Sequence, residues 1–405
     1  MIERRDFLKA VGAVGAGTAL TAAAPTQLLA TTDDLNKLPE AGAALVEHTK
    51  RILRLCELRA GEVFVLATPY TFDADYVTAM LTAAGELGAV GAQMAVFPKI
   101  SENGLIEKNL HDWHWQAYAQ ADLLIATGLG NTVNTPTAVS AYGAKVARHE
   151  YRTDMEFINR PGSKTRWLDL GYDMVRQQRY FPTAERKART VRGARLLDEN
   201  KGEIRVTKPD GTDLRMHNRG RPGHAQYGYS DVPGKWDNFG YGCVAVGPVE
   251  NSWEGTLVLA PGDIVVELYP KVLEEPIKLT FSGGYVTNVE GGRRAREFQA
   301  LLGANNNRES FGGAHFGWGV HENTTLRDEA DIGHYHHNRI GTLLFALGMN
   351  FAHGVGGPEA GYSGLGMTTR VAPNHSHFSV HNADVFVAGR KVIDRGRVDP
   401  AAGGI

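Results

Sequence analysis

Histidine is concentrated in the last third of this 405-residue sequence. Nine of the fifteen histidines lie between His315 and His381. Imidazole nitrogens bind divalent transition metals, and a pKa near neutrality also lets them transfer protons. The cluster therefore indicates metal chemistry, acid–base chemistry or both in this part of the chain.

Two of these histidines are separated by a single residue. In His375-Ser376-His377 this spacing places both imidazoles on one face of a β-strand, where they could bind one ion, although the spacing also arises by chance. His315, within Gly313-Ala-His-Phe-Gly-Trp-Gly319, is a candidate third ligand. Three imidazoles leave positions open for substrate, water or dioxygen, as a catalytic metal requires. We expect three other histidines of the cluster to be solvated on the surface: His334, His336 and His337.

The first part of the chain alternates between strand-like and helix-like patterns. Strands are expected at residues 62–67, 91–97 and 122–127, and helices at 41–60 and 73–88. Such alternation is typical of a parallel sheet covered on both faces, so we predict a small α/β domain over residues 40–165. Gly128-x-Gly130 lacks the third glycine of a dinucleotide-binding fingerprint, and we interpret it as a turn.

The second part of the chain is rich in strands. A hairpin is expected over residues 204–214, further strands at 255–260, 264–268, 277–281 and 284–289, and a helix at 293–302. Residues 166–200 read as a helical connector, and residues 201–405 as a C-terminal metal-binding catalytic domain. The predicted fold class is therefore α/β: an N-terminal domain with a parallel sheet, followed by a strand-rich α+β domain.

The composition excludes several classes of partner. A formal net charge of -2 argues against nucleic acid or an anionic membrane, because both require a basic surface. The only two cysteines, Cys56 and Cys243, have no framework spacing. An oxidising compartment would permit a bridge between them, but lone cysteines are more often buried apolar residues.

The first thirty residues have the pattern of an export leader. Arg4-Arg5-Asp6-Phe7-Leu8-Lys9 is a twin-arginine motif, and the apolar stretch Ala10–Ala24 that follows is too short to span a bilayer. We expect cleavage between Ala24 and Thr31, leaving a mature protein outside the membrane. The twin-arginine translocase carries folded cargo, so the predicted location is the bacterial periplasm.

Several segments together resemble a known superfamily. They are 202–214, 254–259, Gly284-Tyr-Val-Thr-Asn-Val-Glu-Gly-Gly292, His315-Phe-Gly-Trp-Gly319 and the final His375-x-His377. In this order they are similar to the thermophilic leucyl aminopeptidase-like superfamily, and more closely to its 2,5-dihydroxypyridine 5,6-dioxygenases. Asp231-Val-Pro-Gly-Lys-Trp-Asp237 resembles a segment near the substrate pocket of those enzymes.

The resemblance implies a mononuclear metal site. The dioxygenases hold iron(II) with two histidines and an aspartate, which implies His315 and His375 as ligands and places His377 where the aspartate stands. Three imidazoles suit Fe2+, but Zn2+ and Cu2+ as well. The peptidases bind two metals, yet the positions of two of their ligands read Gly242-Cys243 and Leu343-Leu344 here, which favours one metal.

The activity expected from the resemblance is the opening of a hydroxylated aromatic or N-heteroaromatic ring by dioxygen, in a homo-oligomer. His224 is our candidate base, because imidazole titrates near the working pH. Tyr227 could donate a hydrogen bond, and Trp236 could stack on the substrate or belong to the core. Two alternatives remain at this point: a metal-dependent hydrolase of amides, lactams or peptides, and a periplasmic protein that binds a small ligand without turnover.

Overall fold

The computed structural model describes residues 42–405, apart from 71, 97, 101–105, 109–116, 119, 128–163, 172–173, 305, 327–330, 333–334, 349–371 and 373. The predicted leader, the turn at Gly128-x-Gly130 and His334 lie outside the described residues. The fold class is α/β, with one parallel sheet and two antiparallel sheets. Each helix of the described part is too short or too polar to cross a bilayer.

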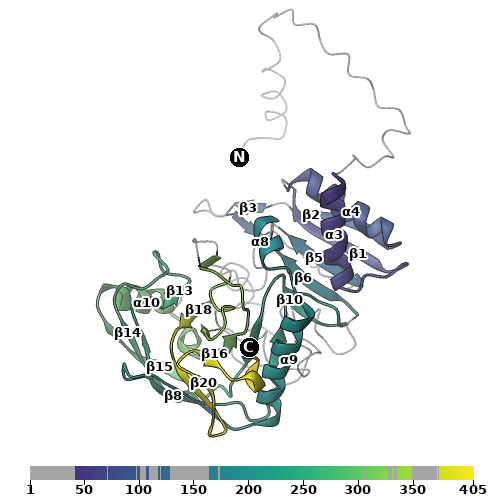
Figure 1. Cartoon of the computed structure of the whole chain (residues 1–405). Coiled ribbons are helices and arrows are strands. Elements are labelled where there is room, and N and C mark those ends of the chain that lie inside the picture. The colour runs from purple at the N-terminus through teal and green to yellow at the C-terminus, as the bar shows by residue number, and fades with distance from the viewer. Residues whose placement is uncertain are drawn as a thin grey trace, which may run out of the picture. The chain divides into compact units, whose positions relative to one another are not determined.

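The parallel sheet has five strands in the order β10-β6-β5-β1-β2 (Figure 1). They are β1 (Val63–Pro69), β2 (Val90–Val96), β5 (Leu123–Thr127), β6 (Arg166–Leu170) and β10 (Trp236–Asn238). Helices α3 (Ala43–Leu55) and α4 (Ala74–Glu86) contact each other, and α4 also contacts β1 and β2. The strands expected at 62–67, 91–97 and 122–127 are confirmed.

Local sequence explains these elements. The interior of β1 is apolar and buried because both faces of a central parallel strand are covered. Helix α4 begins after Asp73, whose carboxylate accepts hydrogen bonds from the backbone N–H groups of Asp75 at 2.9 Å and Tyr76 at 3.0 Å.

The parallel sheet extends beyond the boundary expected at residue 165. Strand β6 lies at the start of the segment read as a connector, and β10 comes from the part assigned to the C-terminal domain. The rest of that connector is helical as predicted, with α8 (Met174–Arg179) and α9 (Ala184–Glu199). Strands β3 (Pro98–Ile100) and β4 (Ile106–Lys108) pair with each other in a separate two-stranded sheet.

An eight-stranded antiparallel sheet has the order β15-β14-β12-β8-β7-β19-β20-β21. Its strands are β7 (Glu203–Thr207), β8 (Asp213–His217), β12 (Glu254–Leu259), β14 (Ile277–Ser282), β15 (Tyr285–Gly291), β19 (Asp384–Val387), β20 (Arg390–Asp394) and β21 (Arg397–Val398). The predicted hairpin is β7–β8, where buried residues alternate with more exposed ones. Helix α10 (Arg293–Gly303) follows β15 as predicted.

A six-stranded antiparallel sheet carries the histidine motifs, in the order β13-β18-β17-β16-β11-β9. It consists of β9 (His224–Gln226), β11 (Cys243–Val246), β13 (Ile264–Val265), β16 (Gly313–Gly319), β17 (Leu343–Gly348) and β18 (His375–Val380). The 3-10 helices Arg308–Phe311 and Pro400–Ala402 flank these elements in the sequence. The strand expected at 264–268 is shorter, with only its first two residues in β13. Cys56 and Cys243 are both buried and free.

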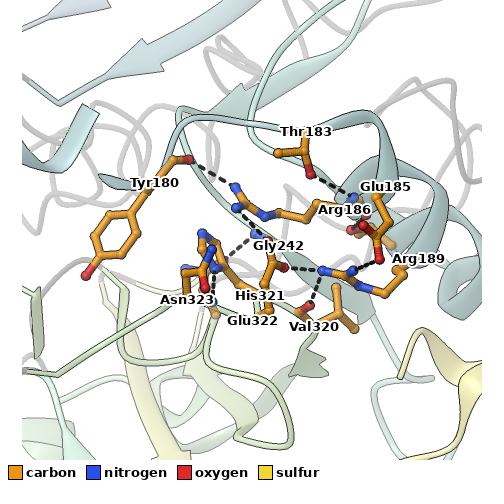
Figure 2. A network of polar contacts seen from close by, with 12 residues as sticks. Tyr180, Thr183, Glu185, Arg186, Arg189, Gly242, Val320, His321, Glu322 and Asn323 are labelled. Atoms are coloured by element: carbon orange, nitrogen blue, oxygen red, sulfur yellow. Dashed lines mark hydrogen bonds and ion pairs between the residues drawn. The ribbon is translucent and has the colours of Figure 1, made fainter. Parts of the chain in front are cut away.

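Helix α9 is joined to the end of β16 by a buried ionic network (Figure 2). Arg186 and Arg189, with side chains 1% and 4% exposed, share the carboxylate of Glu322; the Arg186 contact is 3.2 Å. Arg186 also donates to the carbonyl oxygen of Tyr180 at 3.0 Å. Burial, reinforced by the charge of Arg186, lowers the pKa of His321 to about 3, so this imidazole is neutral. The network thus fixes the chain just beyond the strand that carries His315.

We expect Glu322→Gln to lower the free energy of unfolding by about 3–5 kcal/mol, because it leaves two buried arginines without their shared carboxylate. Urea unfolding at neutral pH measures the change. The matched control is Glu185→Gln: Glu185 also pairs with Arg189 but is 79% exposed, so its loss should cost at most about 1 kcal/mol. Equal losses of stability in the two variants would contradict a stabilising role for the buried network around Glu322.

The same carboxylate makes the stability depend on pH. Burial raises the pKa of Glu322, but hydrogen bonds from its own backbone and from Arg186 outweigh this, and the net shift is downward. A lowered folded-state pKa stabilises the fold above the unfolded pKa, and this stabilisation is lost as pH falls through the folded value. The difference in unfolding free energy between wild type and Glu322→Gln should therefore shrink below about pH 4.5. If the difference in unfolding free energy stays constant down to pH 3, the Glu322 carboxylate is not the source of this pH dependence.

Candidate metal centre

Strand β16 supplies the first histidine of the centre and is completely buried. Its glycines are required by the packing of the backbone: a methyl group at Gly317 would collide with the carbonyl oxygen of Val244 on β11. At Gly319 it would collide with the carbonyl oxygens of Asn338 and Arg339. Neighbouring backbone atoms approach β16 so closely at these positions that only glycine fits, which explains the Gly-rich sequence around His315.

The register of the central strands brings the distant histidines together. Strand β17 lies between β16 and β18, with Ala346 opposite His377 and Gly348 opposite His375. A β-bulge between Gly313 and Phe316 interrupts the pairing of β16 with β17 beside His315. Because the residues of β17 opposite the pair are small, the three imidazoles can meet across this strand.

The three imidazoles form a compact group. One ring nitrogen from each of His315, His375 and His377 lies within 4.8 Å of the others. The ring centroids of His315 are 5.0 Å from His375 and 5.1 Å from His377. His315 and His375 are buried, with 1% and 8% of their surfaces exposed, and His377 is partly buried. The three histidines that the sequence singled out therefore lie together. Within the described ranges, they form a group of side chains that could hold a metal ion.

The donor set fits a divalent transition metal. Nε2 of His375 lies 2.9 Å from Nε2 of His377. Two nitrogens that bind one ion at about 2.1 Å and at right angles to each other would be about 3.0 Å apart. A ring nitrogen of His315 lies within 4.8 Å of one from each of the other two histidines, close enough for the three to share an ion. Three neutral nitrogen donors suit iron, zinc or copper better than calcium or magnesium.

The opposite face of the same strands is an aromatic core. Phe316, Phe345 and Phe378 form one row across β16, β17 and β18. Their ring centroids are 5.2 Å and 5.5 Å apart, and the rings of Phe345 and Phe378 are nearly parallel. Since side chains alternate between faces, this row holds the histidines on the other side of the sheet.

His336 and His337, expected to be solvated, are buried and lie against the triad. Their ring centroids are 6.2 Å and 6.0 Å from that of His377. Nδ1 of His336 is 2.5 Å from Oγ of Ser379, and Nε2 of His336 is 3.1 Å from Nδ1 of His337. The prediction that these residues are solvated was wrong, because the sequence of this short segment does not show that distant residues cover it. His336 and His337 are buried by contacts with β18 and with Tyr241, whose ring centroid is 5.1 Å from that of His337.

The segment that precedes this histidine pair is tied to α8. The carboxylate of Asp331 is completely buried, with Arg176 at 2.8 Å and Arg179 at 3.4 Å. Within the triad, Oε1 of Glu267 accepts the backbone N–H of His377 at 2.9 Å. Burial raises the pKa of Glu267 to about 7. Acidic side chains therefore hold both the segment before the histidine pair and the backbone of His377.

His224, the candidate base, lies on β9 at the edge of the same sheet. Register through Ala245 to Gly317 places its side chain on the face that also carries His315. Strand β9 lies two strand spacings, or about 10 Å, from β16. Burial, assisted by the charge of Lys235, lowers the pKa of His224 well below its ordinary value. The imidazole of His224 is therefore neutral at neutral pH, and its pKa is lower than that of an exposed histidine.

Tyr227 belongs to a buried network rather than to an open surface. Its hydroxyl donates to Oδ1 of Asp231 at 2.6 Å, and Nζ of Lys235 lies 3.7 Å from its ring centroid. Lys235 forms a fully buried ion pair with Asp237, which accepts the backbone N–H of Tyr227 at 2.9 Å. The Asp231–Asp237 segment thus joins β10 of the parallel sheet to the turn after β9.

Trp236 is part of the core of the parallel sheet. Its indole N–H donates to Asp169 at 2.9 Å, and the indole of Trp167 donates to the other oxygen of the same carboxylate at 3.0 Å. Trp236 is 3% exposed. Of the two interpretations given for this residue, the structure supports the core.

Known proteins resemble this chain in sequence and in fold. Residues 151–400 match the model of the 2,5-dihydroxypyridine 5,6-dioxygenase family. The chain belongs to this family. A curated family member, the 2,5-dihydroxypyridine 5,6-dioxygenase of Pseudomonas putida KT2440, is 30% identical over 227 residues. This alignment covers 54% of the chain and 60% of the relative, which is less than two thirds of the relative's length.

Two solved structures share the fold of this dioxygenase-family chain. The 2,5-dihydroxypyridine dioxygenase from Pseudomonas putida KT2440 has a TM-score of 0.70 at 23% identity, covering 89% of this chain and 98% of that one. AmpT from Thermus thermophilus has a TM-score of 0.59 at 15% identity, covering 87% and 98%. Residues 1–21 match the signal sequence of the twin-arginine translocation pathway, so the chain carries an export signal.

Loss of a triad histidine should strongly weaken metal binding. Removing a hydrogen-bond partner of a metal ligand typically weakens metal affinity about 10–100-fold. His375→Ala removes a proposed ligand itself, so we expect a larger loss of affinity. Competition with a chromophoric chelator measures the affinity, and circular dichroism checks the fold. His217→Ala, on β8 of the other antiparallel sheet, is the control and should bind metal normally. Unchanged affinity in His375→Ala would remove this residue from the ligand set.

Proposed function

We propose that this protein is a metal-dependent dioxygenase that opens a hydroxylated aromatic or N-heteroaromatic ring. His315, His375 and His377 are the proposed ligands, and Fe2+ is the proposed metal. The observation that carries the proposal is the convergence of these imidazoles on one face of a sheet in a member of the 2,5-dihydroxypyridine 5,6-dioxygenase family. Dioxygen and a small aromatic molecule are the proposed substrates.

The surroundings of the triad suit such chemistry. Bound iron would supply a centre at which a substrate hydroxyl and dioxygen are activated side by side. His315 and His375 are buried, so water has little access to the part of the centre that they form. The rings of Tyr241 and His337 lie edge to face beside His377 and provide a flat apolar border. An aromatic ring packs favourably on such a border.

We propose His224 as the base that removes the hydroxyl proton of the substrate. Its neutral imidazole retains a lone pair, and it faces the same side of the sheet as His315. A substrate ring together with water molecules would have to span the gap between the two strands, which are roughly 10 Å apart. For Tyr227 we propose an indirect role, because its hydroxyl already donates to Asp231 and thereby holds the turn that follows His224.

We also propose that the protein works in the periplasm as a homo-oligomer. The export signal supports delivery by the twin-arginine translocase. Insertion of iron before export would protect a three-histidine site from copper and zinc, which bind nitrogen ligands more tightly than iron does.

Oxygen uptake tests the proposed reaction. The protein loaded anaerobically with Fe2+ should consume one equivalent of dioxygen per hydroxypyridine opened, and His315→Ala should not. The zinc-loaded protein should consume none, because zinc has no redox chemistry. If the iron-loaded protein takes up no oxygen while the zinc-loaded protein hydrolyses an amide or lactam, the chain is a hydrolase instead.

The same variant separates catalysis from simple ligand capture. A binding protein would keep its ligand affinity in His375→Ala, since its recognition would not need a metal. We expect the affinity for a hydroxypyridine and the turnover to fall together with the metal content. Retained affinity in the metal-free variant would support the binding-protein alternative.

A further inference from the structure

A groove lies at the end of the six-stranded sheet where β17 begins and β18 ends. Its volume is about 1280 Å³, and it is bordered by Thr342, which precedes β17, and by His381, which follows β18. His375 and His377 lie in the first half of β18, where the chain enters this strand. Among the described residues that line the groove, none belongs to the triad, so the groove is a second concave surface.

Part of the wall of this groove is apolar. Ile264 on β13, Val272 and Ile340 line it, and Ile264 is only 1% exposed. An isolated antiparallel bridge pairs Ile264 with Val272, so these two side chains come from neighbouring backbone segments. A concave apolar wall of this kind can remove the apolar part of a small molecule from water.

The acidic side chains of the groove are paired with cations. The carboxylates of Asp210 and Asp263 lie 2.9 Å and 3.5 Å from Nζ of Lys208. The carboxylate of Asp394 lies 3.2 Å from Nζ of Lys391. Each of these negative charges is therefore offset within the protein.

Two arginines of the same groove are not offset in this way. Arg339 and Arg397 are exposed, and neither side chain forms an ion pair or a hydrogen bond in the part of the chain that the structure describes. The two turns that carry them touch, because a methyl group at Gly341 would collide with the carbonyl oxygen of Gly396. Two positive charges therefore extend from one small region, where an anion between them would relieve their repulsion.

We propose that this groove binds an organic carboxylate with an apolar body, at a site separate from the metal centre. Arg339 and Arg397 bind the carboxylate, because a guanidinium group offers paired N–H donors that match its two oxygens. Ile264, Val272 and Ile340 contact the apolar body. A neutral molecule of the same shape lacks the charge that the two arginines recognise. Binding at this groove needs neither a metal nor dioxygen.

A matched pair of ligands tests the requirement for charge. The full chain is titrated by calorimetry at pH 7 and low ionic strength with 4-phenylbutanoate and with 4-phenylbutanamide. The two molecules have nearly the same shape, and the carboxylate alone is charged at this pH. We expect 4-phenylbutanoate to bind at least about tenfold more tightly. Its affinity should fall as salt is added, because salt screens exposed charges.

Variants that each remove one charge locate the site. Arg339→Gln and Arg397→Gln should each weaken the binding of 4-phenylbutanoate about tenfold, because each loses a charge-assisted hydrogen bond. The matched control is Arg390→Gln on the same β20–β21 hairpin. Arg390 is exposed, lies 3.3 Å from Asp399 and is not among the described residues that line the groove, so its loss should leave the affinity unchanged. Urea unfolding verifies that every variant keeps the fold.

His375→Ala separates this groove from the metal centre, since a carboxylate can also bind a metal ion. We expect this variant to bind 4-phenylbutanoate as tightly as the wild type does. A loss of affinity in His375→Ala would place the carboxylate at the metal centre and overturn the inference. Equal affinities for the acid and the amide, no binding of the acid, or unchanged affinity in both Arg339→Gln and Arg397→Gln would overturn it as well.

Discussion

The hydrogen-bond register between β17 and β18 is the constraint on which the centre depends. It places His375 and His377 on the face that His315 also occupies, and it places Phe378 with Phe345 and Phe316 on the other. A slip by one residue would turn both histidines into the aromatic core and expose the phenylalanine. The packing of that core therefore enforces the geometry of the metal site without touching it.

Buried charge is distributed unevenly in this molecule. Where elements meet, charged groups are paired: Lys235 with Asp237 between the turn after β9 and β10, and Arg186 and Arg189 with Glu322 between α9 and the end of β16. At the histidine surface the converging group consists of imidazoles. Ion pairs thus join separate elements of the fold, while imidazoles meet on the face of the six-stranded sheet.

Local patterns in the sequence predicted most of the elements and the triad itself. Strands β1, β2 and β5 and the β7–β8 hairpin follow from apolar runs and turn residues, and His375-x-His377 follows from the period of a strand. What sequence could not give is pairing over long distances, such as β10 joining β6. For the same reason His336 and His337 were misjudged: their burial depends on Ser379 and Tyr241, which lie far away in the chain.

The two cysteines bear on how the chain survives a change of surroundings. Burial raises the pKa of Cys56 to about 12 and also raises that of Cys243, so both remain thiols rather than nucleophilic thiolates. A thiol that stays protonated is slow to oxidise or to exchange with disulfides. Both cysteines are therefore expected to react slowly with oxidants. A protein with a twin-arginine signal can pass from a reducing to an oxidising compartment without any rearrangement of sulfur.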